Sequence, residues 1–95
     1  MTIISDPWLG EREVGDEPID VIKDQRNLLK AMCDDGRRPT RELLYDIKFY
    51  DYIISSSRPN YLAEEYLTKI GKLRATAGRL RASKREVAGM LGWKV

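Results

Sequence analysis

The chain has 95 residues, of which 42% are hydrophobic and 34% are charged, and its formal net charge is +2 at pH 7. This length favours a single domain, and the composition is that of a folded chain rather than a disordered one. Because the sequence contains no histidine and one cysteine, it excludes a Ser-His-Asp triad, a Cys-His pair and a Cys/His zinc site.

The first 15 residues contain proline and glycine and show no sustained hydrophobic period. They predict an extended N-terminal arm over 1–15, which precedes a single α-helical domain over 16–95. The apolar residues that would anchor this arm are Ile3, Ile4, Trp8 and Leu9. Trp8 and Leu9 either pack onto the helices or dock into a pocket of a partner, because tryptophan is a common interface anchor.

A first helix is predicted near 17–34. Pro18 suits its first turn, where the missing N–H costs nothing, and acidic residues there complement the positive end of the helix dipole. Its apolar face comprises Ile19, Ile22, Leu29, Met32 and Cys33. Asp16, Asp20 and Asp24 recur every four residues, but the helix dipole accounts for such carboxylates, and we expect no metal site here.

A second helix is predicted from Arg41 to about Ile54, with Thr40 as its N-cap. One of its apolar stripes comprises Leu43, Leu44, Ile47, Tyr50 and Ile54, and a second comprises Tyr45, Phe49 and Tyr52. A helix that is apolar over most of its circumference is either central in the fold or shared with a second chain. The sequence leaves both interpretations open.

A third helix follows the break at 55–59, and Asn60 can cap it. We expect this helix to cover about 60–82 and a short fourth helix to cover about 84–91, although one unbroken helix fits the same pattern. Apolar residues recur here at heptad spacing and predict a seam in the core or between subunits. Its central members are Tyr66, Ile70, Leu73, Ala77 and Leu80.

The segment from Lys69 to Arg85 is basic and contains no acidic residue. Together with Trp8 and Leu9, the residues that we expect to bind a partner are Lys69, Lys72, Arg74, Arg79, Arg81, Lys84 and Arg85. Residues 1–47 hold seven Lys/Arg and eleven Asp/Glu, a net charge of −4, whereas residues 48–95 hold ten and four, a net charge of +6. Such a polarised chain attracts an acidic partner, or its two ends attract each other within or between chains. A solvated basic face is the remaining interpretation.

Residues 83–92 resemble the first helix and turn of a helix-turn-helix unit, since a serine and a glutamate form a capping box ahead of apolar residues and Gly92 ends the helix. Three residues follow Gly92, which is too few for the recognition helix that enters the major groove. We therefore expect no sequence-specific DNA recognition from this motif.

The predicted fold is all-α, a small three-helix domain with a short fourth helix and an extended N-terminal arm. Its apolar helical surface exceeds what a three-helix monomer easily buries, which favours a homo-oligomer. The predicted function is that of a non-enzymatic interaction or regulatory protein, which self-associates and binds a protein partner through the arm or the basic C-terminal helix. A compact helical protein without histidine would suit a virus or mobile element that modulates its host. The alternative is a nucleic-acid-binding accessory protein that contacts phosphates through Lys69–Arg85.

No residue spacing in the chain indicates a catalytic site, and we expect no cofactor and no metal. The sequence has no apolar run long enough to span a membrane, and its N-terminus lacks a basic region followed by a long apolar stretch. A cytoplasmic location is therefore expected. The single cysteine, Cys33, agrees with this expectation, because it lies in an apolar helical pattern and has no partner for a disulfide within the chain.

Overall fold

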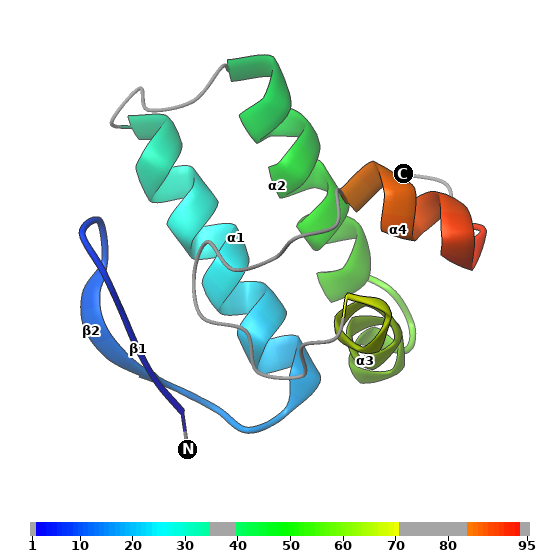
Figure 1. Cartoon of the computed structure of the whole chain (residues 1–95), viewed down its shortest axis with the longest axis horizontal. Coiled ribbons are helices and arrows are strands. Elements are labelled where there is room, and N and C mark those ends of the chain that lie inside the picture. The colour runs from blue at the N-terminus through cyan, green and yellow to red at the C-terminus, as the bar shows by residue number, and fades with distance from the viewer. Residues whose placement is uncertain (1, 35–39, 71–83, 94–95) are drawn as a thin grey trace.

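The computed structural model describes residues 2–34, 40–70 and 84–93. In chain order, its elements are β1 (Thr2–Asp6), β2 (Gly10–Val14), α1 (Pro18–Asp34), α2 (Thr40–Ile54), α3 (Pro59–Lys69) and α4 (Lys84–Leu91) (Figure 1). The described part of the chain is mostly helical, as the sequence predicts, and it carries a small two-stranded sheet in addition. The predicted all-α class is therefore confirmed in outline and corrected at the N-terminus.

The N-terminal arm is a β-hairpin rather than an unpaired segment. β1 and β2 pair antiparallel, with Ile4 opposite Arg12. Successive side chains of a strand point to opposite faces, so Ile4, Arg12 and Val14 share the inner face of the hairpin. Ile4 and Val14 are buried there, whereas Ile3 on the outer face is 61% exposed. The hydrophobic pattern missed this strand because Arg12 occupies an inner position that strict alternation assigns to an apolar residue.

The first turn of α1 is capped by side chains from two elements. Asp20 accepts a hydrogen bond from the Glu17 N–H at 3.2 Å. Asn60 of α3 accepts one from the Ile19 N–H at 3.0 Å. A Cβ added at Gly15 would overlap the Asp20 carboxylate, so a larger residue at this position would displace that side chain. The predicted role of Asn60 as the cap of α3 is wrong, since α3 has no side-chain cap and the amide serves α1 instead.

The central helix, α2, packs against both α1 and α3. Its fully buried residues are Leu43, Phe49, Tyr50 and Ile53. Its second aromatic stripe is covered by the C-terminal part of the same chain. Trp93 lies 5.9 Å from Phe49 and 5.9 Å from Tyr52 between ring centroids, and the Arg85 guanidinium lies 4.3 Å above the Tyr45 ring. A second subunit is therefore not needed to cover this stripe.

The third helix is shorter than predicted. It ends at Lys69, and Ile70 forms a turn. The prediction of a continuous helix to about residue 82 is therefore wrong, because the helix that contains Tyr66 already ends before Ile70. Gly71 is the next residue in the sequence, and glycine is the residue type that most often follows a helix end. α4 agrees with the predicted short helix over 84–91.

The predicted heptad seam is only partly within the described residues. Tyr66 is fully buried, and Ile70 is half-buried against the core of its own chain. The other central members, Leu73, Ala77 and Leu80, lie outside the described residues. The described members of the seam therefore pack within this chain.

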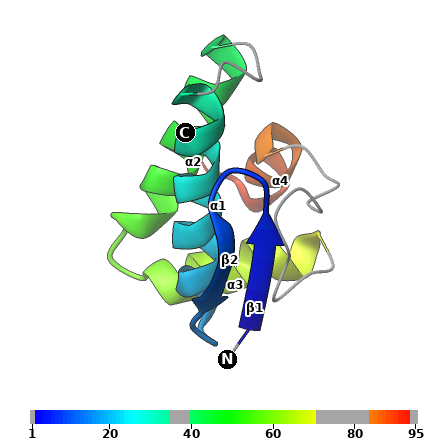
Figure 2. The same cartoon turned by 90° about the vertical axis from the view of Figure 1, so that its left-hand side faces the viewer.

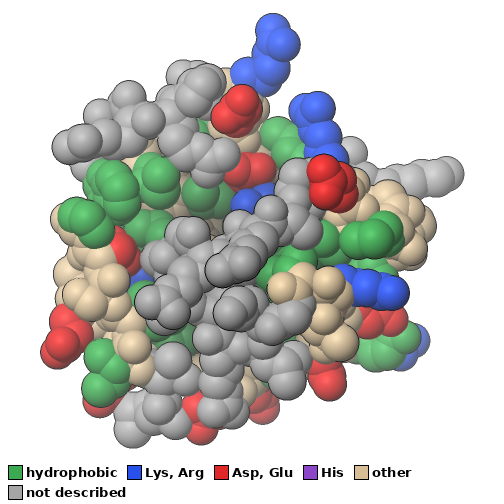
Figure 3. All heavy atoms as spheres, viewed as in Figure 1, with side chains coloured by type: hydrophobic (Ala, Val, Ile, Leu, Met, Phe, Trp, Pro, Cys, Tyr) green, Lys and Arg blue, Asp and Glu red, His purple; other side chains and the backbone are tan. Residues whose placement is uncertain are grey.

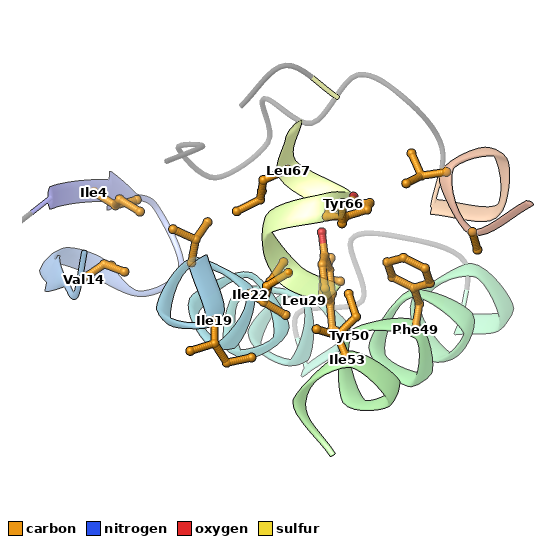
Figure 4. Close-up of a cluster of buried hydrophobic side chains, with 14 of the residues drawn as sticks. Ile4, Val14, Ile19, Ile22, Leu29, Phe49, Tyr50, Ile53, Tyr66 and Leu67 are labelled. Carbon is orange, nitrogen blue, oxygen red and sulfur yellow. The ribbon is translucent and has the colours of Figure 1, made fainter. Parts of the chain in front are cut away.

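One core joins the hairpin to the described helices (Figure 4). Ile4 and Val14 of the hairpin lie at one end of this core, beside α1, while an aromatic group lies between α2 and α3. In that group the ring centroids of Tyr50 and Tyr66 are 6.1 Å apart, edge to face, and Phe49 contacts both rings. The hairpin and α2 lie on opposite sides of α1 (Figures 1 and 2). The core therefore fixes the hairpin on the face of α1 that α2 leaves free.

Candidate functional site

The turn of the hairpin, residues 7–9, is held by the side chain that precedes it. Asp6 Oδ1 accepts hydrogen bonds from the Trp8 N–H at 2.9 Å and from the Leu9 N–H at 2.8 Å. Gly10 closes the turn at φ 71°, in the left-handed region that glycine adopts without a steric cost. The backbone of this turn is therefore fixed by Asp6 and Gly10.

Arg12 ties the turn to α1. Its guanidinium donates hydrogen bonds to both carboxylate oxygens of Asp24, to Asp6 Oδ2 and, at 2.9 Å, to the Gly10 carbonyl. Asp24 is buried, and the Asp6 side chain is nearly so. A bidentate contact between arginine and a carboxylate combines two charge-assisted hydrogen bonds with a fixed orientation. Arg12 therefore holds the hairpin and α1 in one arrangement.

The electrostatics of this cluster favour its charged form. The hydrogen bond to Asp24 raises the pKa of Arg12, against the opposing effect of burial. For Asp6, burial alone would raise the pKa, but hydrogen bonds from the Leu9 N–H, from Arg12 and from the Trp8 N–H lower it below its ordinary value. Both groups are therefore charged at neutral pH.

The fixed turn presents apolar side chains at the surface. Leu9 is 37% exposed, Pro7 is exposed and Trp8 is half-buried. Hydrophobic side chains gather on the left of Figure 3, where Figure 1 places the turn and the adjoining part of α1. Of the predicted anchors of the arm, Ile4 is buried, whereas Leu9 and Ile3 face solvent. The turn thus combines a rigid backbone with exposed apolar groups.

The described basic residues of the C-terminal part differ in their surroundings. Lys69 is exposed. Lys84 is half-buried, with its Nζ 3.9 Å from Asp46 Oδ2 and 5.2 Å from the centroid of the Tyr50 ring. Arg85 is exposed and stacks on α2, as described above. Four further basic residues of the predicted site lie outside the described residues, namely Lys72, Arg74, Arg79 and Arg81.

An open depression of about 370 Å³ lies between α3 and the end of α4. Its lining consists of Tyr61, Glu64, Glu65, Thr68, Lys69 and Leu91. The hydrogen bond to Glu65 raises the pKa of Tyr61, and the Arg58 guanidinium lies 4.2 Å above the Tyr61 ring. No sequence pattern indicated this depression, because only the packing of α4 brings Leu91 to α3. Its wall is mixed in character, with two carboxylates, one lysine and apolar side chains.

Other polar groups serve the fold. Burial raises the pKa of Tyr66 to about 12, so this hydroxyl is neutral at physiological pH. Asp20 and Asp24 bind Glu17 and Arg12, respectively, and do not share a ligand. Among the residues that the structure describes, no three Cys, Asp or Glu side chains come together as a metal site would require. No described helix has the length and apolar content needed to cross a membrane.

Sequence reasoning missed two of the residues that build the turn. Asp6 stands before Pro7 and four residues before Gly10, which is a turn signal, because aspartate accepts hydrogen bonds from backbone N–H groups that follow it. Arg12 gave no such signal, since its partner Asp24 is twelve residues away on another element. Comparisons with protein-family models, with curated proteins and with solved structures found no match to this chain.

Proposed function

We propose that this chain is a non-enzymatic protein-interaction module, which binds a protein partner through the turn of its N-terminal hairpin. The observation that supports the proposal is a turn held in one conformation by Asp6 and Arg12, with Leu9 and part of Trp8 at the surface. A preorganised loop loses little conformational freedom on binding, which favours affinity. Tryptophan and its apolar neighbours are suited to anchor such an interface.

The described contacts favour the hairpin over the basic C-terminal helix as the docking element. Lys84 points toward Asp46 and Tyr50 of its own chain, and Arg85 lies on Tyr45. Both cations therefore contribute to holding α4 on α2, and a partner would have to compete for them. Leu9 at the turn is open to solvent and needs no such exchange.

The experiment is affinity capture from a nuclease-treated extract of the native host, with the full chain as bait. Leu9→Ser and Trp8→Ala remove the apolar groups of the turn, and we expect each to reduce the captured partner at least tenfold. Met90→Ser is the matched control, because Met90 is an exposed apolar residue on α4, 61% exposed. Circular dichroism verifies that each variant is folded.

Capture that survives both turn variants would refute docking through the turn. Capture that is lost on nuclease treatment of the wild-type sample would instead favour the nucleic-acid alternative, whose contacts with phosphates weaken steeply between about 50 and 200 mM salt.

A further inference from the structure

The outer face of the hairpin is acidic around one exposed aliphatic residue. Ile3 lies opposite Glu13, and Ser5 lies opposite Glu11, so all four side chains share the face that points away from α1. All four are exposed. Arg12 points to the inner face and is bound by two aspartates there, so it does not neutralise this surface. We call Ile3, Glu11 and Glu13 the acidic face.

The outer face of α2 has the opposite character. Arg41, Leu44 and Lys48 follow one another at i, i+3 and i+7, which places them on one side of the helix. All three are exposed, and Leu44 is 58% exposed. Within the described part of the chain, neither Arg41 nor Lys48 forms an ion pair. We call these three residues the basic face.

We propose that the chain associates with a second copy of itself by packing the acidic face of one copy against the basic face of the next. Each face has an aliphatic side chain at its centre, Ile3 or Leu44, which would be removed from water in the contact. Glu11 and Glu13 are about 7 Å apart along their strand, and Arg41 and Lys48 are about 10 Å apart along their helix, distances that long basic side chains bridge.

The arrangement of the fold makes this contact intermolecular. The hairpin and α2 lie on opposite sides of α1, so the two faces of one molecule cannot meet (Figures 1 and 2). A contact between two different surfaces is heterologous, and it forms rings or open chains rather than a simple twofold dimer. The association therefore grows with protein concentration.

The charges of the two faces determine which surfaces come into contact. Two acidic faces repel each other, as do two basic faces, so each selects the other. Exposed ion pairs are screened by salt, so the association weakens as ionic strength rises. The surface differs from the turn used in the proposed function, since it employs Ile3, Glu11 and Glu13 and not Leu9. Its test is therefore independent of turn docking.

The experiment measures mass by light scattering and sedimentation at about 20 mM and 300 mM salt, over a range of protein concentrations. We expect the wild-type chain to form species above the monomer at low salt and to lose them at high salt. The double variants Glu11→Lys with Glu13→Lys, and Arg41→Glu with Lys48→Glu, should each weaken association at least tenfold. Met90→Ser, at an exposed residue of α4 outside both faces, is the control and should associate as the wild type does.

The decisive measurement is the association of a mixture of the two double variants. Each variant alone presents two faces of like charge, whereas the mixture offers opposite charges in both possible contacts. We expect the mixture to recover association that neither variant has alone. A wild-type chain that stays monomeric at low salt overturns the proposal, as does a mixture that fails to recover association between variants shown to be folded.

Discussion

At the scale of single residues, Arg12 has the largest set of contacts in the hairpin. It binds the buried Asp24 with two hydrogen bonds and holds Asp6 on its other side. Removing the arginine would leave a buried carboxylate without its counter-charge, which costs far more than the loss of an exposed ion pair. This residue therefore links the local geometry of the turn to the stability of the whole chain.

We predict that Arg12→Met lowers the free energy of unfolding by about 3 kcal/mol. Arg26→Met is the control, because Arg26 pairs at 2.8 Å with an Asp51 side chain that is 47% exposed, and its loss should cost about 1 kcal/mol or less. Urea denaturation followed by far-ultraviolet circular dichroism measures both. Equal costs for the two variants would contradict the role assigned to Arg12.

Asp6 makes the stability of the folded chain depend on pH in the acidic range. Its pKa is lowered in the folded chain, so its contribution to stability is fully present above the unfolded value of 3.8 and is lost as the pH falls through the lowered value. We predict that Asp6→Asn destabilises the chain by about 1 kcal/mol at pH 6 and by much less at pH 2.5. Denaturation of both proteins at both pH values tests this, and a difference that does not change with pH would count against it.

At the scale of elements, the start of α1 depends on a glycine outside the helix. Gly15 leaves room for the Asp20 carboxylate, which accepts a hydrogen bond from the first turn. An alanine at this position would push the carboxylate away from the Glu17 N–H. The loop residue and the cap therefore act as one unit.

We predict that Gly15→Ala and Asp20→Ala each cost about 1 kcal/mol, the usual value of a helix cap. The double variant should cost no more than Asp20→Ala alone, because the alanine at 15 then meets no carboxylate. Thermal and urea denaturation of the wild type and the three variants give the free energies of unfolding for this double-mutant cycle. Additive costs in the double variant would show that Gly15 matters for another reason.

The element boundaries show which sequence signals were reliable. α1, α2 and α4 agree closely with their predicted ranges, because Pro18, Thr40 and the capping pattern after Ser83 mark helix starts in the sequence itself. The heptad spacing through residues 63–80 pointed to one long helix, but α3 ends at Lys69. The spacing of apolar residues predicts which side chains would share one face if the segment were helical. It does not predict where the helix ends.

At the scale of the whole molecule, the aromatic group around Phe49 joins three helices. This ring lies 5.2 Å from Tyr66 of α3 and 5.9 Å from Trp93, which follows α4. A small domain buries a limited core and has a stability of about 5–10 kcal/mol, so one such residue carries a large share. Leu44 lies on the same helix but faces solvent.

We predict that Phe49→Ala lowers the free energy of unfolding by about 3–5 kcal/mol, whereas Leu44→Ala changes it by about 0.5 kcal/mol or less. The measurements belong at low protein concentration and high salt, where association through Leu44 does not contribute. A small effect of Phe49→Ala would mean that the helices are held together elsewhere.

The exposed surface also changes the case for self-association. The sequence favoured an oligomer because α2 is apolar on two stripes, yet Trp93 and Arg85 cover the second of them within the chain. Of the first stripe, Leu44 is exposed, and it lies between two cations. The proposed self-association therefore rests on complementary charged faces and not on a large apolar surface of α2.

Residues close together in the chain were enough to predict the helical class, the starts of three helices and part of their buried faces, although Leu44 was assigned to a buried stripe and is exposed. Three features could be seen only in the folded chain, namely the pairing of the arm as a hairpin, the cap that Asn60 provides to α1 and the contact between Arg12 and Asp24. Each of these contacts joins residues that are distant in sequence or hides a charge at a position where periodicity expects an apolar group. Burial of a charge beside its counter-charge leaves no hydrophobic pattern, so the ion pairs that order the turn between β1 and β2 could not be predicted from periodicity.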